Sequence, residues 1–210
     1  MEADRFRPFI LLAAVFLITA GLGFLLKAEF TDIDSDFSVW LSSTFSSGIL
    51  DSVSDIIDDF GGIPIVAAIS VLMMLHPRTR IIGTVCLLVS VIAWAADSFL
   101  LKYIVARPRP YDFLDADVAA NWSEYSYVSG HAIATSAFAA ALFRYSRSIS
   151  AVFFCYSIFV CFMRVYCLAH YVTDVIMGSL LGIVFAVVLA AYMERVSDLF
   201  WAALPPHRAD

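Results

Sequence analysis

The stretch VTDVIMGSLLGIVFAVVLAAYM, residues Val172–Met193, is an apolar run whose one charged residue, Asp174, lies close to its start. A helix needs about 20 predominantly apolar residues to cross the hydrocarbon core of a bilayer. We therefore predict a transmembrane helix over this stretch. This prediction decides how the rest of the chain is interpreted, because a spanning helix needs partners of the same kind.

Five further apolar runs precede it: Pro8–Leu26, Gly62–His76, Ile81–Val105, Gly130–Tyr145 and Ile149–Tyr166. The second and fourth of all six runs are short, so each by itself also fits a re-entrant segment. A chain of 210 residues can hold roughly six spans joined by short loops. We predict an all-α fold, a six-transmembrane-helix bundle that forms a single domain over residues 1–210. An even number of spans places both termini on one side of the membrane.

The composition agrees with a membrane protein. Hydrophobic residues make up 61% of the chain and charged residues 15%, against about 45–50% and 25% in a soluble domain. This excludes a disordered chain, a nucleic-acid-binding protein and an ordinary cytosolic enzyme. The net charge of −6 is mild, so the positions of the few charges carry more information than their sum.

The basic residues orient the bundle. With the N-terminus inside, the inner side holds Arg5, Arg7, Arg78, Arg80, Arg144, Arg147, Arg195 and Arg208. Because cytoplasmic loops are enriched in Lys and Arg, we predict cytoplasmic termini and an outward-facing opposite end in the plasma membrane. No clear cleavage site follows the first run, so an uncleaved first span is favoured over a signal peptide. The basic residues left on the outer side are Lys27, Lys102, Arg107, Arg109 and Arg164.

The segment Lys27–Gly61 has amphipathic rather than spanning character. Its apolar residues recur at helical spacing in two sets separated by Gly48, with Ser and Asp on the other faces: Phe37, Trp40, Leu41 and Phe45, then Leu50, Val53, Ile57 and Phe60. We predict two short amphipathic helices on the outer membrane surface. We expect them mainly to pack against the bundle, with a role in shaping a lipid entrance as the weaker alternative.

Three polar clusters stand at the outer ends of the predicted spans: Lys102-x6-Arg109-Pro110, Ser129-Gly130-His131 and Arg164-x5-His170-x3-Asp174. In the predicted topology all three meet on one side. Unpaired cations beside a low-dielectric wall are costly, so three together indicate an anionic ligand, and phosphate suits guanidinium and ammonium donors. A single cation here is as often a side chain that snorkels to the interface, and for Arg107 that interpretation is preferred.

His170 and Asp174 are four residues apart and share one face of a helix. The carboxylate can then accept from one imidazole nitrogen and leave the other free to attack, as in hydrolase triads; the alternative is a helix-capping Asp beside an unrelated His. Ser129-Gly130 suits a helix start whose N–H groups bind an anion, or simple capping. A zinc site built from His131, His170 and Asp174 is disfavoured by the nearby cations, so we expect neither a metal nor another cofactor.

The three clusters resemble the signature of the phosphatidic acid phosphatase type 2 superfamily, which includes integral-membrane lipid phosphatases, glucose-6-phosphatase and soluble vanadium haloperoxidases. The motifs cover Lys102–Asp174, and the short loops are similar to those of small bacterial or archaeal members. Two positions depart from the pattern. Val128 stands where the family has Pro, and Met163 stands where it has Ser.

The resemblance implies a role for each motif residue. His170 would attack phosphorus and form a phosphohistidine, Asp174 would orient and activate it, and His131 would protonate the leaving oxygen and then assist water. The phosphate oxygens would be held by Lys102, Arg109, Ser129, the Gly130 N–H and Arg164.

We therefore expect a lipid phosphatase in the bilayer whose substrate is undecaprenyl diphosphate, phosphatidylglycerol phosphate or phosphatidate, with a slight preference for the polyprenyl diphosphate or a broad specificity. One alternative is a phosphotransferase that passes the phosphoryl group from His170 to another lipid. An anion transporter or channel is the alternative from another class. It would distribute charges through the spans, whereas away from the motifs only Asp97 lies inside an apolar run.

Overall fold

The predicted apolar runs all form helices. The computed structural model describes residues 2–113 and 125–203, and every regular element in this part of the chain is helical. The elements are α1 (Glu2–Glu29), α2 (Thr31–Thr44), α3 (Gly48–Phe60), α4 (Ile63–Met74), α5 (Arg80–Ala96), the π-helical turn η1 (Asp97–Leu101), α6 (Lys102–Val105), the 3-10 turn η2 (Pro110–Phe113), α7 (Gly130–Leu142), α8 (Arg147–Tyr166) and α9 (Val172–Ala203). The all-α prediction is confirmed for the described residues. Arg208, which the topology prediction used, lies outside them.

In the described part of the chain, four or five helices are long and apolar enough to cross a bilayer, so the predicted count of six spans is not confirmed. Four segments are long and apolar enough: Phe6–Glu29, Arg80–Val105, Arg147–Tyr166 and Val172–Ala203. A fifth is reached when α3 and α4, bent by 61° at their junction, are counted as one span. The helix α7 has 13 residues and is about 20 Å long, against roughly 30 Å of hydrocarbon. The predicted count of six includes this short helix, and its role as a span stays a prediction.

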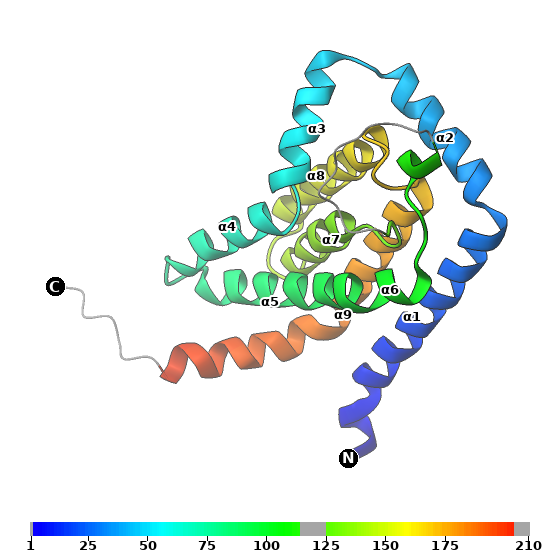
Figure 1. Ribbon diagram of the computed structural model, residues 1–210. Helices are drawn as coiled ribbons and strands as arrows, with labels where there is room; N and C mark the ends of the chain where they lie inside the picture. The colour runs from blue at the N-terminus through cyan, green and yellow to red at the C-terminus, as the bar shows by residue number, and fades with distance from the viewer. Residues whose placement is uncertain (1, 114–124, 204–210) are drawn as a thin grey trace.

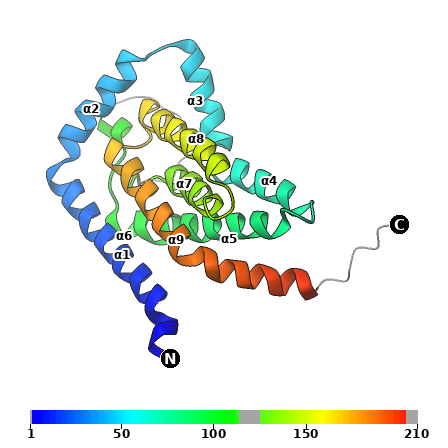
Figure 2. The same cartoon turned by 180° about the vertical axis from the view of Figure 1, so that it is seen from behind.

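The position of α7 explains why a short apolar helix suffices. It lies in the middle of the bundle, enclosed by α4, α5, α8 and α9 (Figures 1 and 2). Eleven of its residues are buried, among them many alanines that allow close approach of its neighbours. Because protein rather than lipid surrounds it, its ends do not have to reach the two membrane surfaces.

Two glycines of α9 set the distance between α9 and α7. A Cβ atom at Gly182 would lie 2.3 Å from Ser136 Oγ and 2.4 Å from the Ile133 carbonyl oxygen. A Cβ atom at Gly178 would lie 2.9 Å from the Ser129 carbonyl oxygen. Small residues four apart are a common device for close helix packing in membranes. Here they bring the beginning of α9 next to the beginning of α7.

The outer surface of the bundle is apolar. Large exposed hydrophobic side chains occur on several of the long helices, for example Leu17 of α1, Ile158 of α8 and Val187 of α9. The buried core is formed chiefly by α5, α7 and α9. Such an apolar exterior on long helices is the arrangement of a multi-pass membrane protein.

The segment before α4 forms two helices, as its amphipathic pattern predicts. Both α2 and α3 pack on α8. On the α3 side, Ile57 is buried against Val160 and Met163 of α8, with Leu50 and Val53 beside it. Packing against the bundle is thus observed, whereas the location of these helices on the outer membrane surface stays a prediction. In Figure 1, the chain turns between α1 and α2 and then crosses to α3.

We expect Gly182→Ala to destabilise the protein, because the added methyl group meets the backbone carbonyl of Ile133, which cannot move without shifting α7. Overpacking of this kind costs about 1–3 kcal/mol. The measurement is the thermal unfolding midpoint of the purified protein in detergent. Gly21→Ala is the matched control, since nothing lies within 4 Å of its Cβ position. Equal midpoints for the two variants would contradict the proposed packing constraint.

Candidate active site

The three polar clusters lie together at one end of the bundle. Arg109 Nη1 donates to the Ala169 carbonyl oxygen at 2.6 Å, which joins the first cluster to the loop that carries His170. The Ser129 N–H donates to the Asp174 carbonyl oxygen at 3.3 Å, which joins the second cluster to the third. The His170 N–H donates to the Arg164 carbonyl oxygen at 3.1 Å. These contacts form one site from segments far apart in the sequence.

His170 and Asp174 of the third cluster lie close together, but they do not share one face of a helix as predicted. His170 lies in the loop between α8 and α9, and its Nδ1 is 3.7 Å from Oδ2 of Asp174 in the first turn of α9. This distance is longer than a hydrogen bond, as is common for catalytic pairs before a ligand binds. The Asp174 carboxylate faces Nδ1, so Nε2 is the nitrogen available to a substrate.

Burial lowers the pKa of the His170 imidazole and so favours its neutral form. The side chain is almost wholly buried, and the loss of hydration is the largest cause that lowers its pKa well below the ordinary 6.5. The positive charges of Arg109, Lys102 and Arg164 lower the pKa further. Only the unprotonated nitrogen of a histidine is a nucleophile. The same environment that attracts an anion therefore maintains the nucleophilic form.

The three predicted cations are buried at this end of the bundle. Lys102 of α6 is 6% exposed, Arg109 3% and Arg164, near the end of α8, 2%. The Lys102 ammonium donates to the Tyr125 carbonyl oxygen at 3.1 Å. Their concentration in one buried place is the electrostatic signature of an anion site.

The beginning of α7 has the predicted capping structure. Ser129 is the N-cap and its hydroxyl accepts from the Ala132 N–H. Its neighbour Gly130 lies against Trp94, since a Cβ atom there would be 3.1 Å from the indole ring. A helix N-terminus presents free N–H groups and the positive end of the helix dipole. The described residues around the site contain no group of three His, Cys, Asp or Glu side chains arranged to hold a metal ion.

Asp58 of α3 enters the site, which the sequence did not indicate. Its carboxylate forms an ion pair with Nη1 of Arg164. Its backbone carbonyl oxygen lies 3.2 Å from Nε2 of His131. Gly62 permits this approach, because a Cβ atom there would lie 2.8 Å from the His131 ring. Two predicted site residues are thus in contact with the last turn of α3 when no ligand is bound.

The interpretation of Arg107 as a snorkelling cation is wrong. Its side chain has no exposed surface. Nη1 donates to Asp174 Oδ1 at 2.8 Å, and Nη2 donates to Asp34 Oδ2 at 3.1 Å. The only signal in the sequence was its place beside Arg109 in the run Arg-Pro-Arg-Pro. Its two carboxylate partners come from other parts of the chain, so no local spacing pointed to them.

The two departures from the family pattern have structural counterparts. Val128 is buried, and its N–H donates to Asp97 Oδ1 at 3.1 Å. A proline at position 128 would have no N–H to donate, so it could not form this hydrogen bond with Asp97. Met163 is buried in the interface between α8 and Ile57 of α3. Its thioether fills an apolar contact instead of contributing a hydroxyl to the site.

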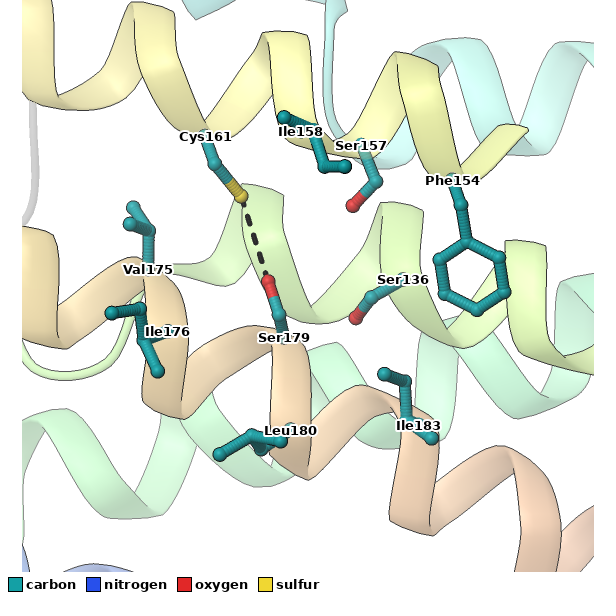
Figure 3. Close-up of a pocket in the computed structure, with 10 residues that line it drawn as sticks. All are labelled: Ser136, Phe154, Ser157, Ile158, Cys161, Val175, Ile176, Ser179, Leu180 and Ile183. Atoms are coloured by element: carbon teal, nitrogen blue, oxygen red, sulfur yellow. Dashed lines mark hydrogen bonds between the residues drawn. The ribbon is translucent and has the colours of Figure 1, made fainter. Parts of the chain in front are cut away.

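An apolar groove of about 330 Å³ lies between α8 and α9, with Ser136 of α7 at its floor (Figure 3). Figure 3 shows Cys161 and Ser179 facing each other across it, with Sγ and Oγ 3.5 Å apart. Among the described residues, its lining includes no member of the three clusters. One of its lining residues, Val175, follows Asp174 in the sequence.

Comparison with known proteins identifies the family. The PAP2 superfamily matches residues 83–198, more than half of the chain and a range that includes all three clusters. The chain therefore belongs to the PAP2 superfamily. An undecaprenyl-diphosphatase of Sulfolobus acidocaldarius is 34% identical over 123 residues, which cover 54% of this chain and 56% of that protein. The chain thus spans about half the length of this curated relative.

The fold is also similar to a solved structure. It matches the crystal structure of the first transmembrane PAP2 type phosphatidylglycerolphosphate phosphatase from Bacillus subtilis with a TM-score of 0.64 and 21% identity. The match covers 97% of this chain and 100% of that chain. The likeness in fold therefore extends beyond residues 83–198 to helices α1–α4.

We expect the His170 imidazole to remain neutral at about pH 6 when no phosphate is present, because its lowered pKa places protonation well below the usual value near 6.5. The measurement is the ¹⁵N NMR spectrum of histidine-labelled protein in detergent, with His170→Gln to assign the signals. One protonated and one unprotonated nitrogen is the expected pattern. An imidazolium pattern at that pH would contradict the neutral assignment.

Asp58→Asn should strengthen the binding of inorganic phosphate, because the anion no longer competes with the Asp58 carboxylate for Arg164. A partly exposed ion pair is worth on the order of 1 kcal/mol, so Kd should fall by about fivefold. Isothermal titration calorimetry measures it. Asp59→Asn removes the same charge from the exposed neighbouring position and is the control. Weaker phosphate binding in Asp58→Asn, with unchanged binding in Asp59→Asn, would contradict competition between phosphate and the Asp58 carboxylate.

Proposed function

We propose that the protein is a membrane-embedded lipid phosphatase that hydrolyses the terminal phosphate of a lipid phosphate or diphosphate. The observation that carries the proposal is a buried His170 whose Nδ1 faces Asp174, set among three buried cations near the starts of two helices. Membership in the PAP2 superfamily supports it. So do the two phosphatases that resemble the chain in sequence and in fold.

The first chemical step is attack of His170 Nε2 on phosphorus. The P–N bond forms as the bond from phosphorus to the leaving oxygen breaks, and His131 donates a proton to that oxygen. The phosphohistidine ring is cationic, so the Asp174 carboxylate beside Nδ1 stabilises it. In the second step His131 takes a proton from water, the water oxygen attacks phosphorus, and the P–N bond breaks to release inorganic phosphate and restore His170.

The phosphoryl group is held by Lys102, Arg109, Arg164, the Ser129 hydroxyl and the Gly130 N–H. These donors lie in a buried place, where charge stabilisation of the transition state is stronger than in water. We propose that the three side-chain cations supply the charge neutralisation for which other phosphatases use metal ions, so that the enzyme acts without a metal. His131 Nε2 lies 3.2 Å from the Asp58 carbonyl oxygen, and we propose that it exchanges this contact for the leaving oxygen of the substrate.

A lipid suits the surroundings of the site better than a soluble phosphate ester. Phe99, Leu100 and Tyr103 are exposed close to Lys102 in the sequence, and an apolar groove between α8 and α9 is lined in part by Val175, the residue after Asp174 (Figure 3). A head group in the site therefore has hydrocarbon-facing surface near it for the tail. Undecaprenyl diphosphate, phosphatidylglycerol phosphate and phosphatidate are the candidate substrates, with the polyprenyl diphosphate slightly preferred.

We also propose the complete arrangement in the membrane. In it, α4, α7 and the four longer helices form a six-helix bundle. Both termini are cytoplasmic, and the site opens to the outer face of the plasma membrane. The excess of basic residues on the predicted inner side supports this orientation. The helices α2 and α3 then lie at the outer surface, above α8.

The test is release of inorganic phosphate from each candidate lipid by purified protein in detergent, with and without a chelator. We expect His170→Ala to lower kcat by at least about a thousandfold, because the nucleophile is lost. His76→Ala, at an exposed turn between α4 and α5, should leave the rate unchanged.

Full activity of His170→Ala would contradict the nucleophile, and loss of activity with chelator would contradict the metal-free mechanism. Adding an acceptor lipid separates hydrolysis from phosphoryl transfer. Phosphate release that depends on the acceptor would assign the protein as a phosphotransferase instead.

A further inference from the structure

Arg107 is held by a closed set of polar contacts beside the proposed nucleophile. Its Nη1 donates to Asp174 Oδ1 and to Thr173 Oγ1, both at 2.8 Å. Its Nη2 donates to Asp34 Oδ2 at 3.1 Å. The guanidinium carbon lies 3.9 Å from the centre of the Tyr171 ring, a cation–π contact. One planar group thus bridges two carboxylates.

These contacts determine which way the Asp174 carboxylate faces. Oδ1 accepts from Arg107, and Oδ2 accepts from the Tyr171 N–H at 3.1 Å. With a donor on each oxygen the carboxylate cannot rotate freely, and Oδ2 is left directed at His170 Nδ1. Second partners of this kind commonly orient a catalytic side chain through a hydrogen bond to the atom not used in chemistry.

Asp34 holds the other side of the guanidinium. It lies in the first turn of α2 and is buried. The Thr173 hydroxyl donates to the same Asp34 oxygen that Arg107 contacts, and it accepts from Arg107 Nη1. The Thr173 hydroxyl thus donates one hydrogen bond and accepts another, so every contact among these three residues has one donor and one acceptor. The set connects α2 to the first turn of α9, at residues 139 positions apart in the sequence.

We infer that Arg107 is a positioning residue for Asp174, and that Asp34 of α2 holds Arg107 in the position that this role requires. The inference rests on the proposed phosphohistidine chemistry of His170. It differs from a role in phosphate binding, because the guanidinium hydrogen bonds within the described residues go to Asp34, Asp174 and Thr173. Arg107 acts on the rate through Asp174 and His170, whereas Arg109 acts on the bound phosphate.

This distinction gives a test that separates kcat from KM. In Arg107→Met, kcat should fall by about 10–100-fold, the range typical of second partners of catalytic groups, while KM changes by less than about threefold. Arg109→Met should raise KM instead. Arg107→Lys retains the charge but cannot bridge both carboxylates, so its kcat should lie between those of wild type and Arg107→Met. Asp34→Asn should lower kcat by about fivefold, since Arg107 keeps one of its two charged partners.

The control is Arg144→Met, which removes an arginine from an exposed ion pair with Glu194 and should leave both constants unchanged. Thermal unfolding midpoints of all variants identify those that fail to fold. A folded Arg107→Met with wild-type kcat would overturn the inference, and so would a raised KM at unchanged kcat. If Arg107→Met does not fold, wild-type kcat in both Arg107→Lys and Asp34→Asn would overturn it.

A second readout does not depend on any lipid substrate. Diethylpyrocarbonate acylates the unprotonated nitrogen of histidine, and mass spectrometry of the peptide that contains His170 gives the rate. We expect slower acylation of His170 in Arg107→Met than in wild type and an unchanged rate in Arg144→Met. Equal rates in all three would overturn the positioning role. If wild type released no phosphate, the proposed function would fail while this comparison still decided the role of Arg107.

Discussion

The site depends on one constraint, which is that buried charges must be paired inside an apolar bundle. Four basic side chains are gathered there: Lys102, Arg107, Arg109 and Arg164. An isolated charge in such surroundings costs several kcal/mol, so carboxylates of the chain lie among them. Arg107 pairs with Asp34 and Asp174, and Arg164 pairs with Asp58. The arrangement of α2, α3 and the start of α9 around the site follows from this pairing.

The carboxylates differ in how readily a ligand can replace them. Those of Asp34 and Asp174 are buried and hold Arg107 with fixed geometry. The Asp58 side chain is 20% exposed and its partner is Arg164, a proposed phosphate ligand. An incoming phosphate can therefore exchange with Asp58 at small cost, whereas exchange with Asp174 would leave Arg107 buried beside a displaced partner. The need to pair buried charges thus accounts both for the fixed pair of Arg107 with Asp174 and for the pair of Arg164 with Asp58, which we expect a ligand to exchange.

Hydropathy predicted the helices well but not their depth in the membrane. The run Gly130–Tyr145 and the helix α7 begin at the same residue, yet the pattern of apolar residues cannot show whether lipid or protein surrounds a short helix. Similarly, α9 continues to Ala203, beyond the predicted end at Met193, because a helix can extend into polar surroundings after its apolar part ends. Burial in the assembled bundle decides both questions, and burial is a property of long-range packing.

The same limit applies to the site. Motif spacing predicted His131, His170, Asp174 and the three cations because each motif is local. Asp34 and Asp58 contact residues 73 and 106 positions away, so no spacing rule points to them. Both lie outside residues 83–198, the part that the superfamily match covers. The proposed catalytic residues therefore lie in the matched part, while Asp34 of α2 contacts Arg107 and Asp58 of α3 pairs with Arg164. Changes in this segment can alter rate and substrate affinity without changing any residue that touches phosphorus.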